Sequence, residues 1–387
     1  MIKFSPIWFL DKLAITFLVL CVFAFEFSFI GIPLRYYIIT ALFVLSLSVC
    51  KKEFSNRRTL QFWFFVFGAY CILMAYSLIV KMNEPSNFFF FVKPFMVFLV
   101  VPAYCLLFRR FGVERYMNAF AYAMLGLIIL FLYLLVRTAM DPGYGLALND
   151  RSKLIVIVVY DFMPRVVFEN FVFIVPLASY LMSKSQGVKM HICFALIMVI
   201  ALLSMTLGLV LALVVVYLVA LYWKRSWRSI ITLSLVGCLC VYIYLNSPFM
   251  QSVLDTKGDS ADYKTAQLHN VNKDMEGLDF AFGRGLGCEF KDFDSRRITE
   301  PVIEIAGIIM YQSGGFFFIW LIIFPYIIPV IPYVLSRKVD KNSQVLALSQ
   351  LSVFVASMAN PYIWSGSVGL LFMMLFISYR SSKIKIA

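Results

Sequence analysis

Apolar runs of about 20 residues recur along the whole chain, and short polar segments separate them. A helix of that length crosses the ~30 Å hydrocarbon core of a bilayer, because each residue advances the helix by about 1.5 Å. The pattern predicts membrane spans at 13–30, 36–50, 60–80, 89–108, 117–136, 166–182, 191–223, 229–245, 307–335, 343–358 and 365–379.

The run at 191–223 is too long for a single span, since its 33 residues would extend roughly 50 Å as one helix. We therefore expect two short helices that turn near residues 204–208, where the sequence reads Ser-Met-Thr-Leu-Gly. The predicted fold is an all-α polytopic membrane protein of about twelve transmembrane helices, with residues 1–387 forming a single transmembrane domain.

The composition supports the same class of protein. A chain that is 62% hydrophobic and 14% charged is not a water-soluble domain. The first run lacks a small-residue cleavage site and is followed directly by another span, so we interpret it as a retained helix and not as a signal peptide.

Lysine and arginine are concentrated in alternate short loops, and such loops face the cytosol in membrane proteins. The predicted cytosolic segments, including both termini, hold 20 of the 34 basic residues. This topology accounts for most of the net charge of +13, which therefore does not indicate nucleic-acid binding. Two enlarged loops, 137–165 and 246–306, then lie on the periplasmic side.

The first outer loop contains four cations: Arg137, Arg151, Lys153 and Arg165. Arginines at helix ends can extend to lipid headgroups, but guanidinium groups also suit bidentate recognition of phosphate. Glu169 follows Arg165 by four residues, so a helix would put both on one face. That pair either neutralises itself or contributes a carboxylate to a site, since carboxylates inside a membrane usually face the protein interior.

The second outer loop contains the segment Phe-Gly-Arg-Gly-Leu-Gly at 282–287. It does not follow a strand and open a helix, which excludes a dinucleotide-binding fingerprint. The glycines indicate either a tight turn with positive φ angles or a close backbone approach to a ligand.

The end of the same loop gathers charges at the entrance of the next span. Arg296 and Arg297 precede Glu304, which would share a helical face with Gly307 and Tyr311. Such a group is either a solvated charge cluster or part of a site. The glycine pair 314–315 would allow a neighbouring segment to approach closely.

Metal-binding patterns are missing from the sequence. Seven of the eight cysteines sit in apolar spans, Cys288 is the exception, and the two histidines, His191 and His269, lie far apart. We expect neither a metal nor a cofactor.

Several of these features resemble the O-antigen polymerase and ligase superfamily. They are the Gly-Arg-Gly-Leu-Gly turn late in an outer loop, the Tyr-Gln-Ser-Gly-Gly segment at 311–315 that enters an apolar span, the hairpin at 204–208, the twelve spans and the two enlarged outer loops. Two departures stand out. The hairpin reads Met-Thr-Leu-Gly at 205–208 where many members carry Ser-Arg-Gly, and no histidine lies near the tenth span as ligases tend to have. The second departure favours a polymerase.

The resemblance implies an inverting glycosyltransferase of the bacterial inner membrane that acts on undecaprenyl-diphosphate-linked oligosaccharides without a metal or nucleotide sugar. A polymerase transfers the growing glycan to a new lipid-linked repeat unit, whereas a ligase transfers it to the lipid A core. Membrane lipids, a chain-length regulator and a flippase are the implied partners, and nucleic acid is not.

A leaving lipid diphosphate is stabilised by preorganised cations, and an attacking sugar hydroxyl is assisted by a carboxylate. We expect Glu304 to be the base, with Glu169 as the second candidate. The candidates for diphosphate binding are Arg151, Arg165 and Arg284, with Arg296 and Arg297 as alternates. Tyr144, Tyr263 and Tyr311 would contact the sugars. The rival interpretation is a flippase or secondary transporter, because twelve spans are common in that class.

Overall fold

The computed structural model describes residues 5–23, 28–29, 32–83, 91–151, 155–159, 164–204, 206–224, 265–288, 306–358 and 369–384. The span predicted at 229–245 lies outside these residues. So do the turn between the last two predicted spans and much of the second outer loop.

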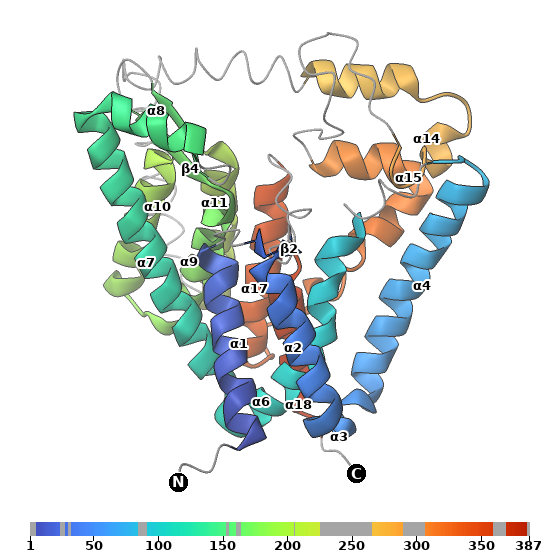
Figure 1. The fold of residues 1–387 in the computed structure, drawn as a ribbon, viewed down its shortest axis with the longest axis horizontal. Helices are drawn as coiled ribbons and strands as arrows, with labels where there is room; N and C mark the ends of the chain where they lie inside the picture. Colours follow the sequence, from blue (N-terminus) through green and yellow to red (C-terminus); the bar gives the residue numbers. More distant parts are fainter. Residues whose placement is uncertain are drawn as a thin grey trace.

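The described chain forms a bundle of apolar helices (Figure 1). Within the described part, five helices are long and apolar enough to cross a membrane. They are Pro6–Phe23, Thr59–Ile79, Lys93–Phe111, Val113–Met140 and Ala306–Ile323. The chain is thus a helical membrane protein, as its hydrophobic pattern predicts.

The first half of the bundle consists of α1 (Pro6–Phe23), α2 (Leu34–Val49), the short α3 (Lys51–Phe54), α4 (Arg57–Ile79), the 3-10 helix η2 (Lys93–Val100), α6 (Val101–Phe111) and α7 (Val113–Met140). Helix α1 begins and α18 ends at the same end of the bundle, which we call the terminal end (Figure 1). The opposite end, which we call the distal end, carries α8 (Pro142–Arg151), α14 (Asp279–Phe282) and a helix at 265–274.

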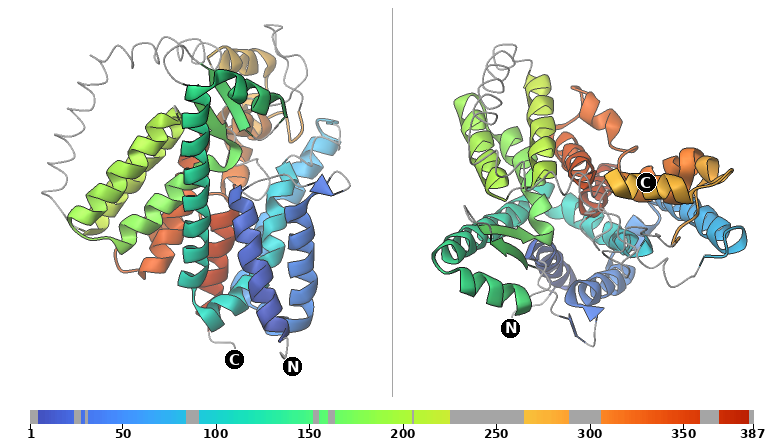
Figure 2. Two further views of the ribbon diagram at one scale, coloured as in Figure 1. Left: turned by 60° about the vertical axis from the view of Figure 1, so that its left-hand side comes forward. Right: turned by 90° about the horizontal axis from the view of Figure 1, so that it is seen from above.

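The second half contains η3 (Glu169–Phe173), α9 (Ile174–Lys184), α10 (Val188–Leu203), α11 (Leu207–Lys224), α15 (Ala306–Ile323), α16 (Ile331–Leu335), α17 (Lys341–Ser357) and α18 (Leu371–Ser382). Helix α10 ends at Leu203 and α11 begins at Leu207, so the predicted turn within the long apolar run is confirmed. The two helices lean outward together at one side of the bundle (Figure 2).

Two antiparallel hairpins add strands to the helical fold. Strands β1 (Ser28–Phe29) and β2 (Ile32–Pro33) form the first, and β3 (Ile155–Val159) and β4 (Pro164–Phe168) form the second, with Val158 opposite Arg165. The helical segment predicted to begin at residue 166 therefore begins at Glu169, with η3 followed by α9. The expected helical face shared by Arg165 and Glu169 is wrong, because Arg165 lies in β4 and Glu169 begins η3. The physical reason is the β-branched run Ile-Val-Ile-Val-Val, which pairs with β4.

Buried aromatic rings pack together where α7, η3 and α18 meet. Phe120 of α7 packs edge-on against Phe372 of α18, with ring centroids 5.1 Å apart, and Phe173 completes the group. Gln350 of α17 is fully buried and uses both ends of its amide: Nε2 donates to the Gly369 carbonyl (2.9 Å), and Oε1 accepts from the Met373 amide (3.0 Å). These bonds join α17 to the start of α18, and they give both the nitrogen and the oxygen of the buried Gln350 amide a partner.

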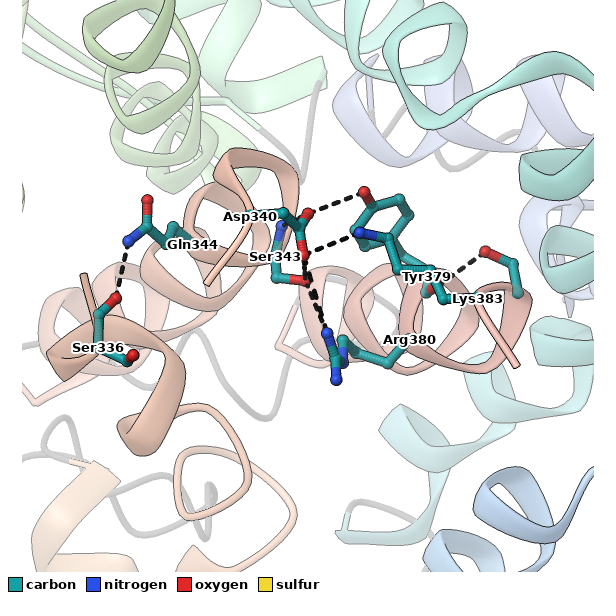
Figure 3. Close-up of polar contacts among 8 residues, drawn as sticks. Ser336, Asp340, Ser343, Gln344, Tyr379, Arg380 and Lys383 are labelled. Atoms are coloured by element: carbon teal, nitrogen blue, oxygen red, sulfur yellow. Dashed lines mark hydrogen bonds and ion pairs between the residues drawn. The ribbon is translucent and has the colours of Figure 1, made fainter. Parts of the chain in front are cut away.

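Paired charges hold the helices together at the terminal end. Asp11 of α1 is buried and accepts hydrogen bonds from Arg115 (2.6 Å) and from the Tyr116 hydroxyl (2.7 Å) of α7. Asp340 precedes α17 and contacts Lys383 (2.9 Å) and Tyr379 (2.8 Å) at the end of α18 (Figure 3). Each cluster joins helices that are distant in the sequence.

Candidate functional site

The glycine segment of the second outer loop forms a tight turn, which we call the Arg284 turn (residues 283–287). Its three glycines have φ angles of +75°, +82° and +73°, a region that side chains other than glycine rarely adopt. The predicted tight turn with positive φ angles is therefore confirmed.

The Arg284 turn docks against a break in helix α15. Gly315 interrupts this helix with φ 55° and ψ −152°, so the helix consists of two halves. The Arg284 amide donates to the Gln312 carbonyl (2.7 Å), and the Gly285 amide donates to the Ser313 carbonyl (3.1 Å). Carbonyls at a helix end have no partner within the helix, and at membrane depth they need one from the protein. The Arg284 turn supplies it.

The glycines on both sides make this contact possible. A Cβ added to Gly283 would lie 2.4 Å from the Ser313 carbonyl, and one added to Gly315 would lie 2.5 Å from the Gly283 amide nitrogen. Both distances are far below van der Waals contact, so neither position tolerates a side chain while the turn is docked. The close approach predicted from Gly314 and Gly315 is thus present, and the approaching segment is the Arg284 turn itself.

The end of α4 holds the other side of the turn. The Tyr76 hydroxyl donates to the Gly283 carbonyl (2.9 Å), and the Leu286 amide donates to Ser77 Oγ (2.7 Å). Asn83 Nδ2 donates to the carbonyls of Arg284 (2.8 Å) and Leu286 (3.0 Å). Sequence reasoning missed these residues at and just after the end of α4, and the one available signal was a group of polar residues at the end of an apolar run.

Two ion pairs flank the turn. The Arg284 guanidinium pairs with Asp274, which ends the helix at 265–274, and Lys81 pairs with Asp279 of α14. The Arg284 side chain is 22% exposed and that of Asp274 is 12% exposed. With one carboxylate for each cation, these four groups are neutral together, so an anionic ligand of Arg284 has to compete with Asp274 or share the guanidinium with it.

Cys288 follows the turn directly and is half-buried. Burial raises the pKa of its thiol to about 11, although the nearby Arg284 acts in the opposite direction. A thiol with so high a pKa reacts slowly near neutral pH, because the thiolate is the reactive form.

The predicted residues of the first outer loop occupy a different part of the distal end. Arg165 is half-buried in β4, and its Nε is buried with no hydrogen-bond partner among the described residues. Tyr144 of α8 has the Arg137 guanidinium over its ring, 5.3 Å from the centroid. Figures 1 and 2 show the β3–β4 hairpin beside α7 and the Arg284 turn beside α4, on different sides of the bundle.

The remaining predicted residues divide into two groups. Tyr311 is half-buried in the first half of α15, directly before Gln312, so it belongs to the half-helix that the Arg284 turn caps. Arg151 ends α8 and Glu169 begins η3, and their side chains are not described. Tyr263, Arg296, Arg297 and Glu304 lie outside the described residues.

Within the described residues, no group of three or more histidine, cysteine, aspartate and glutamate side chains could hold a metal ion. A comparison of the sequence with models of known protein families gave no match, and a comparison with curated proteins gave none either. The functional assignment therefore depends on the residues of the chain itself.

Proposed function

We propose that this protein is a polymerase of a lipid-linked surface polysaccharide, in which an undecaprenyl-diphosphate-linked glycan is transferred with inversion onto a lipid-linked repeat unit. The reaction takes place at the periplasmic face of a bacterial inner membrane. In the proposed topology, the chain crosses the membrane twelve times, both termini lie in the cytosol, and two enlarged loops lie in the periplasm.

The observation that carries this proposal is the way the Arg284 turn is held. Its backbone is bonded on one side to the broken helix α15 and on the other to the end of α4 and the residues after it, so two separate parts of the chain fix its position. A guanidinium on a fixed backbone at the end of a membrane bundle is preorganised for an anion. A leaving lipid diphosphate is such an anion, and it develops its charge at the same membrane boundary.

The orientation of the bundle supports the proposal. Short basic segments such as Lys51–Phe54, Arg109 and Arg110 at the end of α6, and Arg380 and Lys383 at the end of α18 belong to the terminal end. Short basic loops face the cytosol. The distal end, with the Arg284 turn, is then the periplasmic end.

In the proposed reaction, a hydroxyl of the acceptor sugar attacks the anomeric carbon of the donor glycan. The hydroxyl proton passes to a carboxylate, Glu304 or Glu169, while the bond from the anomeric carbon to the diphosphate oxygen breaks. Arg284 is the proposed cation for the leaving diphosphate, and Arg165, which lies on a different side of the bundle, is the proposed cation for the diphosphate of the other lipid-linked substrate. The Nε of Arg165 is buried and has no partner in the part of the chain that the structure describes, which supports its inclusion, since such a donor is unfavourable unless something binds it. Arg151, Arg296 and Arg297 remain further candidates, and Tyr144 and Tyr311 remain candidates for the sugars.

A flippase or secondary transporter is the second candidate, and the break in α15 is the observation that favours it. Transporters often bind substrate at discontinuous membrane helices, whose free backbone groups face the ligand. In this chain the Arg284 turn already occupies the carbonyls of Gln312 and Ser313. A transported ion or substrate therefore has less access to the break, which weighs against this candidate.

The deciding experiment is deletion of the gene, followed by gel analysis of the surface polysaccharide and of lipid-linked material. A single repeat unit on the core supports the polymerase. Accumulation of lipid-linked polymer indicates a ligase, and loss of both surface and periplasmic lipid-linked material indicates a flippase.

Complementation then tests Arg284 with a matched partner variant. Arg284→Ala should abolish polymer, whereas Asp274→Asn keeps the guanidinium and should retain most of it, at equal protein levels. If the two variants lose polymer equally, the Arg284–Asp274 pair has a structural role only, and Arg284 is removed from diphosphate binding.

A further inference from the structure

The chain leaves the end of α4 through an unfavourable backbone conformation. Helix α4 ends at Ile79, and Met82 has a φ of +54°, the one positive φ among the described residues other than glycine. Glycine or asparagine usually occupies such a position after a helix. The Met82 side chain is 84% exposed, so packing of that side chain does not hold it there.

This conformation turns the chain back onto α4. The Asn83 amide donates to the Ser77 carbonyl (3.0 Å), which places Asn83 beside the serine that accepts from the Leu286 amide. Asn83 Nδ2 then reaches the carbonyls of Arg284 and Leu286, one on each side of Gly285. Backbone strain of this kind persists where the surrounding structure requires one geometry.

We propose that Asn83, oriented by the left-handed backbone of Met82, is a positioning residue for Arg284. The effect on activity rests on the proposed function, but the effect on the position of the turn does not. Both groups that Asn83 contacts are carbonyl acceptors, so only a side chain with two N–H donors serves them at once. An asparagine amide has two such donors, and an aspartate in its place has none when ionised.

Loss of these bonds should loosen the Arg284 turn, because only the bonds to Tyr76 and Ser77 would then hold it to α4. The turn is bonded to α15 through the amides of Arg284 and Gly285, while Asn83 holds the carbonyls of Arg284 and Leu286. A turn that leaves α4 therefore also pulls on its bonds to Gln312 and Ser313. The Arg284 guanidinium would then no longer have a fixed position.

Cys288 reports on this docking without any reference to activity. It follows the turn and lies beside Ser313, and burial keeps its thiol largely protonated. The rate at which a polar maleimide modifies Cys288 in the purified full-length protein, followed by mass spectrometry of its peptide, therefore rises when the turn undocks. Global unfolding is followed in parallel by thermal denaturation.

Asn83→Asp and Met82→Val should each raise the rate of Cys288 modification about tenfold, because both hydrogen bonds from Asn83 to the turn are lost and each contributes a few-fold. Valine keeps an apolar side chain at position 82 but tolerates a positive φ poorly, whereas Met82→Gly accepts that φ and should keep modification slow. Ile79→Val, an equally exposed change within the last helical turn of α4, is the matched control and should leave the rate unchanged.

A pH series separates the proposed role from a general loss of packing. The two carbonyl oxygens disfavour the ionised form of the introduced carboxyl group and raise its pKa above the ordinary aspartate range. The ratio of the Asn83→Asp rate to the wild-type rate should therefore fall as the pH is lowered from about 7 to about 5, because the protonated carboxyl group regains one donor. The corresponding ratio for Asn83→Ala should stay constant. Equal Cys288 rates in Asn83→Asp and wild type would overturn the proposal, whatever the activity. Fast modification of Cys288 together with normal polymer would leave the positioning of the turn intact and refute the role of Arg284 in the reaction.

Discussion

Replacing Gly283 with alanine tests the close contact on which the candidate site depends. The substitution has two separate consequences. The Gly283 backbone (φ 75°, ψ 178°) lies in a region that only glycine adopts readily, so it is unfavourable for alanine by about 1–3 kcal/mol, and the new Cβ would lie 2.4 Å from both the carbonyl carbon and the carbonyl oxygen of Ser313. Ordinary contact requires the turn to move away from α15 by about 1 Å.

That movement would break both backbone bonds between the turn and α15, which are 2.7 Å and 3.1 Å long. Each bond contributes about 0.5–1.5 kcal/mol, and the carbonyls of Gln312 and Ser313 would lose their partners. Together with the backbone term, docking of the Arg284 turn should weaken by about 2–6 kcal/mol. A loss of about 2 kcal/mol already lowers the ratio of docked to undocked turn roughly thirtyfold.

Gly277→Ala is the matched control. Gly277 lies in the same loop and has a φ of +51°, but a Cβ added there would meet nothing within 4 Å. This variant should therefore show only the backbone term of about 1–2 kcal/mol. The assay is the rate of Cys288 modification in purified protein, with polymer formation measured in cells at matched expression. Equal modification rates in the Gly283→Ala and Gly277→Ala variants would refute the docking of the turn against α15.

Three further predictions concern other charged residues. Burial by itself raises the pKa of Asp340, but hydrogen bonds from Lys383, Tyr379 and Ser343 outweigh it and lower the pKa from 3.8 to about 2. The carboxylate therefore stabilises the fold above about pH 4, and this contribution is lost as the pH falls toward 2. Because the Asp340 side chain is 32% exposed, Asp340→Asn should cost about 1 kcal/mol at neutral pH, and thermal unfolding of the variant should lose the wild-type dependence on pH between 4 and 2. Arg165→Lys should reduce polymer substantially and Arg165→Ala should nearly abolish it, since lysine lacks the planar donor fork; normal polysaccharide laddering in Arg165→Ala would leave only a headgroup contact. Glu304→Gln should lower the rate of polymer formation by purified protein by about 10²–10⁴ if Glu304 is the base, and near-normal turnover would direct the search to Glu169.

Much of the local structure could be predicted from the sequence. The apolar runs determine where helices form in a membrane, because a bilayer leaves a backbone few other ways to satisfy its polar groups. The apolar run at 191–223 is too long for one membrane span, and this length predicted the break between α10 and α11. The glycines at 283, 285 and 287 indicated positive φ angles, since glycine alone adopts them without penalty.

The strands β3 and β4 could not be predicted from the hydrophobic pattern alone. A run of five apolar, β-branched residues fits a buried strand or part of a helix equally well, and the periodicity does not distinguish the two. The segment is a strand because β3 pairs with β4, so Arg165 lies in a strand and not in the predicted helix. Arg165 and Glu169 therefore do not share a helical face, because that prediction assumed a helix over both residues.

The candidate site itself depends on tertiary structure. The sequence alone showed that Gly314 and Gly315 permit a close neighbour, but not that this neighbour is the Arg284 turn. It gave no reason to connect Asn83 with Arg284, because the two are 201 residues apart. Hydrophobic periods and turn preferences are properties of a few consecutive residues, whereas the bonds that hold Arg284 join α4, α15 and the outer loop. Those bonds form only after the helices have packed, and so the sequence determined the segments while the packing decided which of them meet.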